Sequence, residues 1–382
     1  MRKGLALGFG PGAAIGLGRF GYSLLLPAMQ VSLQLTLAQA GALGSANTGG
    51  YLLGAVISHR ALAAVGYRRG FYGALVLQGV ALLLMGLGPA TGWMIFLRAV
   101  QGVLGAFVFV GGAALLLASG GRAGALGAYF GGVGGGIALS VLILPFAANW
   151  QLGWVALGAL SLLMVAVSLL PYRQLKEPAP PVLGRGGSLA PIALAMLVYA
   201  LYGAGYIGYM TFVTSGVSGS LTLFWLLLGL ATLFNGAVWG WVVARWGGPA
   251  GIRLSLIMLV IASLEPLLRG VPLVSAVLFG VSFLGVITAI TDLFRLKLPP
   301  GAWPRAMALS TAVFAVGQAL GPGLTGLVGD LAGSVAGSLW ASTALLGAGL
   351  AASLLPLGRD RSAGPADPAG PTGPAQAEDA RT

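Results

Sequence analysis

Two arginines lie inside long apolar stretches of this sequence, where a charged side chain needs a specific partner. They are Arg19 and Arg98. A guanidinium group presents planar, paired donors that suit a carboxylate or a similar anion. Three side-chain amides, those of Asn47, Gln101 and Gln318, occur in similar stretches. These five residues are the strongest candidates for binding a polar ligand.

Tyrosines form a second candidate group. Four of them recur at steps of three or four residues, namely Tyr199, Tyr202, Tyr206 and Tyr209. This spacing places them on one face of a helix. The face is either packed against a neighbouring helix or forms the wall of a cavity, and the sequence leaves both interpretations open. Tyr22 shares a face with Arg19 by the same spacing, so Tyr22 and the first three tyrosines of the stripe are candidate ligand contacts.

Catalytic residues are much harder to find. The chain has no Cys and one His, His59, so no cluster of His, Cys and carboxylates has the composition of a metal site. No nucleophile–base pair lies within the apolar stretches, and the glycine runs lack the Lys-Ser/Thr ending of a phosphate loop. We expect no enzyme, no cofactor and no bound metal.

The elements that must position these residues are membrane-spanning helices. The chain is 57% hydrophobic and 7% charged, whereas globular domains are roughly 25% charged. It contains about twelve apolar segments, each close to the ~20 residues that cross a bilayer as a helix. We predict an all-α integral membrane protein with twelve transmembrane helices. The predicted spans cover residues 5–29, 40–58, 70–88, 92–117, 124–147, 150–170, 191–213, 221–244, 250–268, 272–292, 305–328 and 334–357.

Basic residues fix the predicted orientation. A net charge of +12 could indicate a nucleic-acid partner, but nearly all of the 20 Lys and Arg residues fall in every second gap between apolar segments. Cytoplasmic loops of membrane proteins retain Lys and Arg in this way. We therefore expect a lipid bilayer and no nucleic acid as partner. The prediction is a multi-pass protein of the cytoplasmic (inner) membrane with both termini in the cytoplasm and an uncleaved first span.

This orientation gives the two buried arginines a matched depth. Arg19 lies ~14 residues into the first span, or ~21 Å at 1.5 Å per residue, which is ~9 Å below the outer face of a 30 Å core. Arg98 reaches the same depth from the outer end of the fourth span, and Asn47 and Gln318 lie near this level. None of the eight Asp and Glu residues is embedded at mid-membrane, so the layer favours an anionic ligand bound by Arg19 and Arg98 together. Snorkelling of the arginines to the surface is the alternative.

The chain divides into two halves. A Pro-rich segment interrupts the spans, and a Pro-, Gly- and Ala-rich segment ends the chain. We predict an N-terminal six-helix bundle at 1–170, a cytoplasmic linker at 171–190, a C-terminal six-helix bundle at 191–357 and a disordered cytoplasmic tail at 358–382. The halves look like weak repeats, as the halves of many transporters do.

Each half has a glycine followed by basic residues at its predicted cytoplasmic end. Together with the buried polar residues, these motifs resemble those of the major facilitator superfamily, and the resemblance extends over residues 1–357. The segment Arg98-Ala-Val-Gln101-Gly102 looks like the Arg-x-x-Gln-Gly motif of that family. The loop motif after the second span has Ser58 where an Asp is usual, so we expect its arginines to hold the inner gate through helix ends or loop carbonyls. The expected gating residues are Gly54, Arg60, Arg68, Arg69, Gly240 and Arg245.

Within the superfamily, Gly18-Arg19-Phe20, Ala46-Asn47 and Phe314-Ala-Val-Gly-Gln318 look like the YbfB/YjiJ-type branch. The resemblance implies a central cavity lined by spans one, four, seven and ten, and it names no substrate. The fifth span resembles the glycine-rich antiporter motif but lacks a Pro after Gly134-Gly135, so export by antiport is not supported.

The expected function is secondary active transport of a small solute, an organic anion, by alternating access. We expect a monomer, with a proton or sodium as the candidate coupling ion. A drug or metabolite efflux pump of the same fold and a non-transporting membrane sensor or scaffold are the alternatives. A membrane enzyme would need a catalytic constellation, and a channel would need a filter-like segment; neither is visible in the sequence.

Overall fold

The computed structural model describes residues 2–88, 90–120, 123–178, 188–216, 220–268, 272–299 and 302–357. Every regular element in these ranges is a helix, which confirms the predicted all-α class. Eight helical segments among the described residues are long and apolar enough to cross a membrane. The predicted tail at 358–382, residues 179–187 of the predicted linker and Arg269 lie outside the described ranges.

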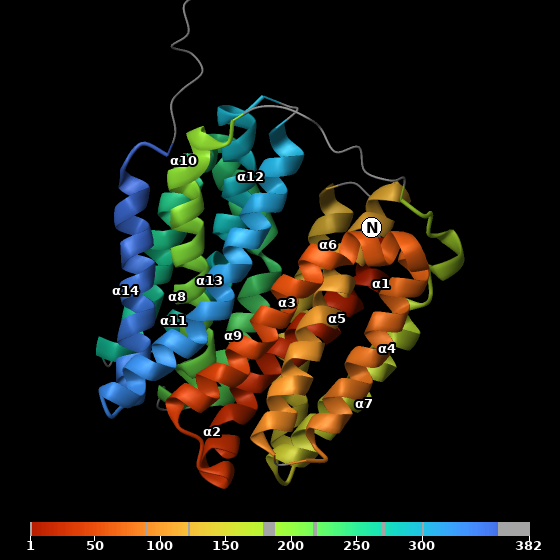
Figure 1. Cartoon of the computed structure of the whole chain (residues 1–382), viewed down its shortest axis with the longest axis vertical. Helices are drawn as coiled ribbons and strands as arrows, with labels where there is room; N and C mark the ends of the chain where they lie inside the picture. The colour runs from red at the N-terminus through yellow and green to blue at the C-terminus, as the bar shows by residue number, and fades with distance from the viewer. Residues whose placement is uncertain are drawn as a thin grey trace, which may run out of the picture.

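The first group of helices packs together and is called here the N-terminal bundle (Figure 1). It comprises α1 (Arg2–Pro11), the π-helix η1 (Gly12–Phe20), α2 (Gly21–Leu33), α3 (Leu37–Val65), α4 (Tyr67–Met85), α5 (Thr91–Ala118), α6 (Ala123–Ile143), the 3-10 helix η2 (Leu144–Phe146), α7 (Trp150–Ser168) and the 3-10 helix η3 (Tyr172–Gln174). Because α1, η1 and α2 follow one another without a gap, the first helical segment is longer than its predicted span.

The second group is called the C-terminal bundle. It comprises the 3-10 helix η4 (Ala190–Ile192), α8 (Ala193–Gly216), α9 (Leu221–Leu233), α10 (Asn235–Leu264), the 3-10 helix η5 (Glu265–Leu268), α11 (Pro272–Ser282), α12 (Gly285–Lys297), α13 (Trp303–Leu331) and α14 (Val335–Leu354). Gly247 has a φ of 78° inside α10, a value that glycine adopts without steric cost. This kink falls in the predicted gap between the eighth and ninth spans, while the predicted eighth and tenth spans are each broken into two helices.

Short polar side chains begin several helices. Thr36 and Gln39 form a reciprocal capping box at the start of α3, and Asn149, Ser220 and Ser334 accept a hydrogen bond from the first turns of α7, α9 and α14. Such caps satisfy backbone N–H groups that have no partner within the helix. The sequence therefore marks where these helices start.

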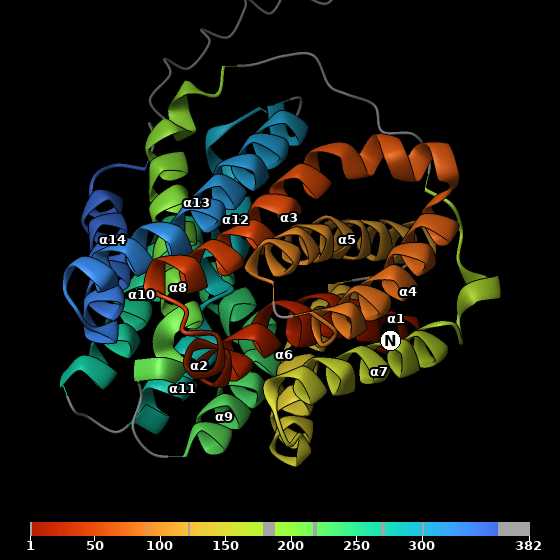
Figure 2. The ribbon, with the colours of Figure 1, turned by 60° about the horizontal axis from the view of Figure 1, so that its bottom comes forward.

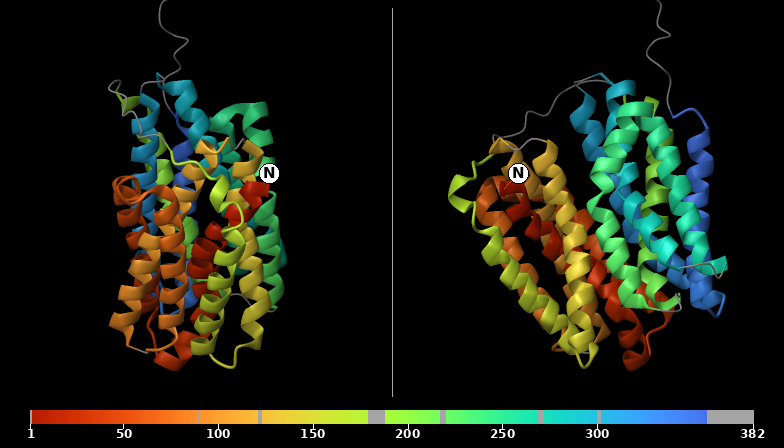
Figure 3. Two further views of the ribbon diagram at one scale, coloured as in Figure 1. Left: turned by 90° about the vertical axis from the view of Figure 1, so that its right-hand side faces the viewer. Right: turned by 180° about the vertical axis from the view of Figure 1, so that it is seen from behind.

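The two bundles lean together at one end and separate at the other, and the N-terminus lies at the separated end (Figures 1 and 3). Viewed from the closed end, α2 and α3 lie beside α8 and α13 (Figure 2). Gly41 of α3 allows this approach, because a Cβ there would lie 2.2 Å from the carbonyl oxygen of Pro322. Gly134 of α6 meets Gly229 of α9 in a similar way.

Glycines also hold α6 against the first helical segment. A Cβ on Gly132 would lie 1.9 Å from the carbonyl oxygen of Gly8, and one on Gly136 would lie 2.2 Å from that of Gly12. Small residues are what let helices approach this closely in a bilayer. Gly131, in the same run, has nothing within 4 Å of its Cβ position, so the run packs through Gly132, Gly134 and Gly136 but not through Gly131.

Large apolar side chains cover the outside of the molecule as well as its core. Leu87, Phe146 and Leu170 are 73%, 88% and 76% exposed, respectively. Exposed apolar area on this scale marks a surface that contacts something other than water. Together with the eight apolar helical segments, this surface identifies a multi-pass membrane protein.

Candidate functional site

The first candidate arginine, Arg19, lies in the last turn of a π-helix. In η1 (Gly12–Phe20) the N–H of Gly21 donates to the carbonyl oxygen five residues earlier. A π-turn is wider than an α-turn and is often found at functional sites. The carbonyl oxygen of Gly18 accepts a hydrogen bond of 2.6 Å from Nη1 of Arg98. The π-helix therefore contains Arg19 and also provides a backbone carbonyl oxygen that accepts a hydrogen bond from Arg98.

Arg98 is 1% exposed and is bound by protein groups on several sides. Besides its bond to Gly18, its Nη1 donates to Oε1 of Gln101 at 3.2 Å, and its Nε donates to the carbonyl oxygen of Leu43 at 3.3 Å. The guanidinium carbon lies 4.6 Å from the centre of the Tyr22 ring. These contacts join α5 to η1, α2 and α3, so Arg98 anchors the helices around it.

Arg19 has a different environment. It is 6% exposed, its Nε donates to Oδ1 of Asn47 at 3.1 Å, and its guanidinium carbon lies 4.7 Å from the centre of the Tyr51 ring. Its Nη2 is buried and has no hydrogen-bond partner. The guanidinium group also interacts with the hydroxyl of Tyr206, in the C-terminal bundle, both electrostatically and as a hydrogen-bond donor. One donor of Arg19 is therefore available to a ligand.

Asn47 links the two arginines. Its Oδ1 accepts from Arg19, and its Nδ2 donates to the backbone carbonyl oxygen of Arg98 at 3.2 Å. This requires a close approach of α3 and α5, which Gly102 permits because a Cβ there would lie 1.9 Å from the carbonyl oxygen of Asn47. The adjacent Thr48 donates to the backbone carbonyl oxygen of Gln318 at 2.8 Å. The predicted polar residues are thus connected across both bundles.

The C-terminal bundle contributes a second buried group without a partner. The amide nitrogen of Gln318 donates to the hydroxyl of Tyr206, and the amide oxygen Oε1 of the same side chain is buried and unpaired. The hydroxyl of Tyr202 donates to the carbonyl oxygen of Phe283, and that of Tyr209 bonds to Ser275 at 2.6 Å. Tyr206 is therefore the member of the tyrosine stripe that lies between Gln318 and Arg19.

The tyrosine stripe is part of a set of nearly parallel rings, called here the aromatic stack. Its members are Tyr199, Tyr202, Tyr206, Phe283 and Phe314. The Phe314 ring centre lies 4.7 Å from that of Tyr199 and 5.8 Å from that of Tyr206, with interplanar angles of 14° and 5°. Four of the rings are buried, and Phe314 is partly exposed. All four tyrosines of the stripe are buried, and three of them pack on Phe314 of α13, which favours the packed-helix interpretation of the stripe.

Several residues of this network were not expected from the sequence. Tyr51 lies four residues after Asn47, and Phe314 lies four residues before Gln318, so helical spacing alone would have put each beside a candidate. Trp154, whose ring centre is 6.0 Å from the Arg98 guanidinium carbon, carries no such local signal.

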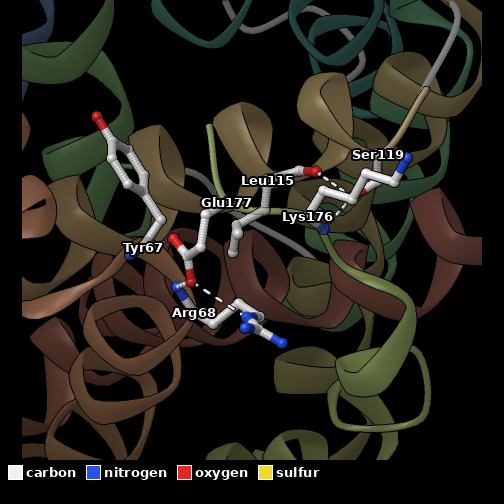
Figure 4. A network of polar contacts seen from close by, with 6 residues as sticks. All are labelled: Tyr67, Arg68, Leu115, Ser119, Lys176 and Glu177. Carbon is white, nitrogen blue, oxygen red and sulfur yellow. Dashed lines mark hydrogen bonds and ion pairs between the residues drawn. The ribbon is translucent and has the colours of Figure 1, made fainter. Parts of the chain in front are cut away.

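The predicted gating arginines lie at the separated end. Arg68 pairs there with a carboxylate that comes from outside the loop motif, in which Ser58 replaces the usual Asp. Glu177, from the segment after α7, accepts from Nε of Arg68 at 3.1 Å and from the backbone N–H groups of Tyr67 and Arg68 at 2.8 and 3.2 Å (Figure 4). The next residue back, Lys176, donates its N–H to Ser119 at 2.8 Å. Arg68 therefore binds a carboxylate here rather than a loop carbonyl.

A cavity of about 400 Å³ opens beside this pair, and its walls include His59, Tyr67, Arg69 and Tyr172. The hydroxyl of Tyr67 lies 2.7 Å from Nδ1 of His59. Burial, and then the negative charge of Glu177, raise the pKa of Tyr67 above its usual value. The hydroxyl therefore stays protonated at neutral pH and can donate to the imidazole.

The other predicted gating residues either pack against a neighbouring helix or are exposed. Gly54 packs against α5, where a Cβ would lie 2.7 Å from the carbonyl oxygen of Val103. Arg60, Arg69 and Arg245 are exposed.

In the second copy of the motif, Gly240 has nothing within 4 Å of its Cβ position. The engaged groups there are Gly248 and Asp292, because the Gly248 N–H donates to the Asp292 carboxylate at 2.8 Å, just after the Gly247 kink.

No group of three or more His, Asp or Glu residues with the arrangement of a metal site occurs within the described ranges.

Comparisons with known proteins agree with this architecture. Residues 12–354 match the protein family described as the uncharacterised MFS-type transporter YbfB. No curated protein matches the chain in sequence. Among solved structures, a mutant of the nucleoside transporter NupG superposes with a TM-score of 0.70 at 14% identity, covering 92% of this chain and 99% of that one. A bacterial homologue of the human lysosomal transporter Spinster, described as inward-facing and unoccupied, superposes with a TM-score of 0.68 at 15% identity, covering 93% and 96%.

The family match spans most of the chain and includes both buried arginines, so the chain belongs to the YbfB-type family of major facilitator superfamily transporters.

Proposed function

We propose that the protein carries a small organic anion across the cytoplasmic membrane by alternating access. Transport is the activity of the family, and the anionic substrate rests on one observation, the buried and unpaired Nη2 of Arg19. A buried donor without an acceptor costs ~1–3 kcal/mol, and more when the group is charged. A carboxylate on the substrate would supply that acceptor through a charge-assisted hydrogen bond.

The acidic side chains with assigned partners support this interpretation. Glu177, Asp292 and Asp330 each accept hydrogen bonds from backbone N–H groups at the start of a helical segment. These three carboxylates therefore have partners other than Arg19.

The two arginines have separate roles in the proposal. Arg19 contacts the substrate, and Arg98 is a positioning residue that holds η1, α3 and α5 in place through its bonds to Gly18 and Leu43. This revises the expectation that both guanidinium groups grip the anion together. Asn47 orients Arg19 by accepting from its Nε.

The separated end of the molecule carries the N-terminus, and the distribution of Lys and Arg predicts that this end is cytoplasmic. On that basis we propose that the conformation is inward-facing and that twelve spans form two six-helix halves. We further propose that the transporter is a monomer and that transport is coupled to the movement of a proton or a sodium ion. The alternative functions are those of an efflux pump of the same fold and of a non-transporting sensor.

The experiment measures binding and transport by the same variants. Purified protein is screened for thermal stabilisation by organic anions, cations and neutral metabolites, because a ligand that binds only the folded state raises its apparent stability. Stabilising solutes are then tested for uptake into proteoliposomes. We expect anions to bind and to be taken up.

Arg19→Lys is the informative variant, since Lys cannot reproduce the planar pair of donors. We expect it to lose ~30-fold or more of the affinity, which corresponds to ~2 kcal/mol. Arg2→Lys, at an exposed position, is the matched control and keeps the parent affinity. Binding only of cations or neutral solutes would rule out the anionic substrate, and binding without uptake would identify a sensor.

A further inference from the structure

The second unpaired group and the aromatic stack narrow the class of anion. We propose that the substrate is a planar aromatic carboxylate that carries a hydrogen-bond donor, such as a ring hydroxyl. The inference rests on the proposed function, because Arg19 is taken as the site of the carboxylate. It adds that Gln318 and the aromatic stack select among carboxylates.

Gln318 provides the acceptor for a donor on the substrate. It is 1% exposed, its Oε1 is buried, and that atom has no hydrogen-bond partner. A buried acceptor without a donor carries the same kind of desolvation cost as a donor without an acceptor. Gln318 and Arg19 flank the hydroxyl of Tyr206 from the two bundles. A ligand beside this hydroxyl that reached both residues would meet a cationic donor from Arg19 and a neutral acceptor from Gln318.

The aromatic stack provides the selectivity for a flat ring. The rings of Tyr199, Tyr202 and Tyr206 lie within 14° of the plane of Phe314. Aromatic rings prefer such offset stacking, and each pair adds stabilisation beyond its buried area. A flat substrate ring would continue the stack, whereas a puckered aliphatic ring would not.

Phe314 is the ring that the substrate would contact. It is partly exposed, while the other four rings of the stack are buried. Phe314 and Gln318 are four residues apart in α13 and therefore lie on one face of that helix. Phe20, the residue after Arg19, meets the stack edge-on, with its ring centre 6.0 Å from that of Phe283. The acceptor, the accessible ring and the arginine thus belong to one continuous cluster.

The test compares carboxylates that differ in one property each. Thermal stabilisation of the purified full-length protein is titrated with para-hydroxybenzoate, para-methoxybenzoate, benzoate, cyclohexanecarboxylate and para-hydroxybenzamide. We expect para-hydroxybenzoate to bind most tightly, with benzoate and para-methoxybenzoate roughly 2- to 10-fold weaker for lack of the donor. Cyclohexanecarboxylate should bind roughly 3- to 10-fold more weakly than benzoate, and the neutral amide should not bind.

Two variants assign these preferences to residues. Gln318→Met should abolish the preference for para-hydroxybenzoate over benzoate, and Phe314→Leu should bring benzoate and cyclohexanecarboxylate to within about 2-fold of each other. Each readout is a ratio of two affinities on one variant, so a general loss of stability does not imitate it. Phe96→Leu, at a ring that is 56% exposed, is the control and should keep the parent ratios.

The outcomes separate this inference from the proposed function. Equal binding of benzoate and cyclohexanecarboxylate to the parent, or ratios that neither variant changes, would overturn the aromatic acid while leaving an anion transporter in place. Binding of aliphatic anions alone would do the same. Binding only of cations or neutral solutes would overturn both.

Discussion

Arg19 and Arg98 show how two residues of one type, at one predicted depth, acquire different roles. Arg98 donates to two backbone carbonyl oxygens and to Gln101. Arg19 keeps one nitrogen without a partner. The difference lies in what surrounds each guanidinium group, because the π-turn of η1 and the start of α3 present carbonyl oxygens to Arg98 and not to Arg19. Depth in the membrane could not distinguish them.

We predict that Arg98→Lys mainly reduces stability. The ammonium group cannot reach the carbonyl oxygens of Gly18 and Leu43 together, and each buried acceptor that loses its donor costs ~1–3 kcal/mol. Unfolding of the purified variant by heat should therefore begin well below the parent temperature, and the folded fraction should keep its affinity for the anion to within about 3-fold. An Arg98→Lys protein of parent stability that no longer binds would show that Arg98 contacts the ligand directly.

At the scale of the helices, acidic side chains serve as caps. Asp330, near the end of α13, accepts from the N–H groups of Leu37 and Ala38 at 2.8 Å each. A carboxylate at a helix N-terminus also interacts favourably with the helix dipole. Because α13 and α3 belong to different bundles, this cap joins the two bundles at their closed end and has to break when that end opens.

We predict that Asp330→Asn opens the closed end more often. Loss of a charged cap costs ~0.5–2 kcal/mol, which corresponds to a shift of about 2- to 30-fold in the equilibrium between open and closed ends. The chain has no Cys, so Gln30→Cys with Ser215→Cys makes a clean reporter pair in α2 and α8. Oε1 of Gln30 and Oγ of Ser215 lie 2.8 Å apart across the closed end, and a short bifunctional thiol reagent makes up for the shorter Cys side chain at position 30. Cross-linking between the two Cys residues should slow in the Asp330→Asn background.

Asp292→Asn is the control for this prediction. Asp292 also caps a backbone N–H, that of Gly248, but both residues belong to the C-terminal bundle. Its neutralisation should leave the rate of cross-linking between Gln30→Cys and Ser215→Cys unchanged. If the two Asn variants behave alike, the cap on α3 does not hold the bundles together.

The glycine run of α6 gives a second prediction at this scale. Gly132→Ala would place a methyl group 1.9 Å from the carbonyl oxygen of Gly8 and force α6 away from α1. We expect a loss of stability of ~1–3 kcal/mol, as for overpacking in a core. Gly131→Ala adds the same methyl group where nothing lies within 4 Å, and it should be neutral or slightly stabilising. Equal thermal stability of the two variants would contradict the packing argument.

At the scale of the whole molecule, the N-terminus, the segment after α7 and the end of α14 all lie towards the separated end (Figures 1 and 3). The side chain of Lys3 donates to the carbonyl oxygen of Gln174 at 3.3 Å, which ties the N-terminus to the start of the linker. These segments therefore emerge at one end of the molecule, and the excess of Lys and Arg predicts that this end faces the cytoplasm.

We predict that reporters at Thr382 and Gly184 are both cytoplasmic. Green fluorescent protein fused at either position should fluoresce, and alkaline phosphatase fused there should be inactive, because the latter folds to its active form only after export. Phosphatase activity at either position would reverse the orientation and place the separated end outside.

The sequence by itself determined the class of protein and the approximate limits of the helices, and it predicted most of the polar residues that lie around Arg19 and Arg98. These features depend on composition, on local periodicity and on the cost of placing Lys and Arg in a bilayer, and each of them acts over a single helix. Helical breaks within predicted spans, at Leu233 and Ser282, were missed because the apolar pattern continues through them.

The tertiary structure decided how those residues are used. Arg98 is satisfied and Arg19 is not, Glu177 supplies the acid that Ser58 does not, and Phe314 joins the tyrosines of α8. Each of these pairs is distant in sequence or depends on a neighbouring helix. A side chain's partners are set by which helices approach closely, and in this protein glycines on facing helices, such as Gly102 opposite Asn47, allow that approach.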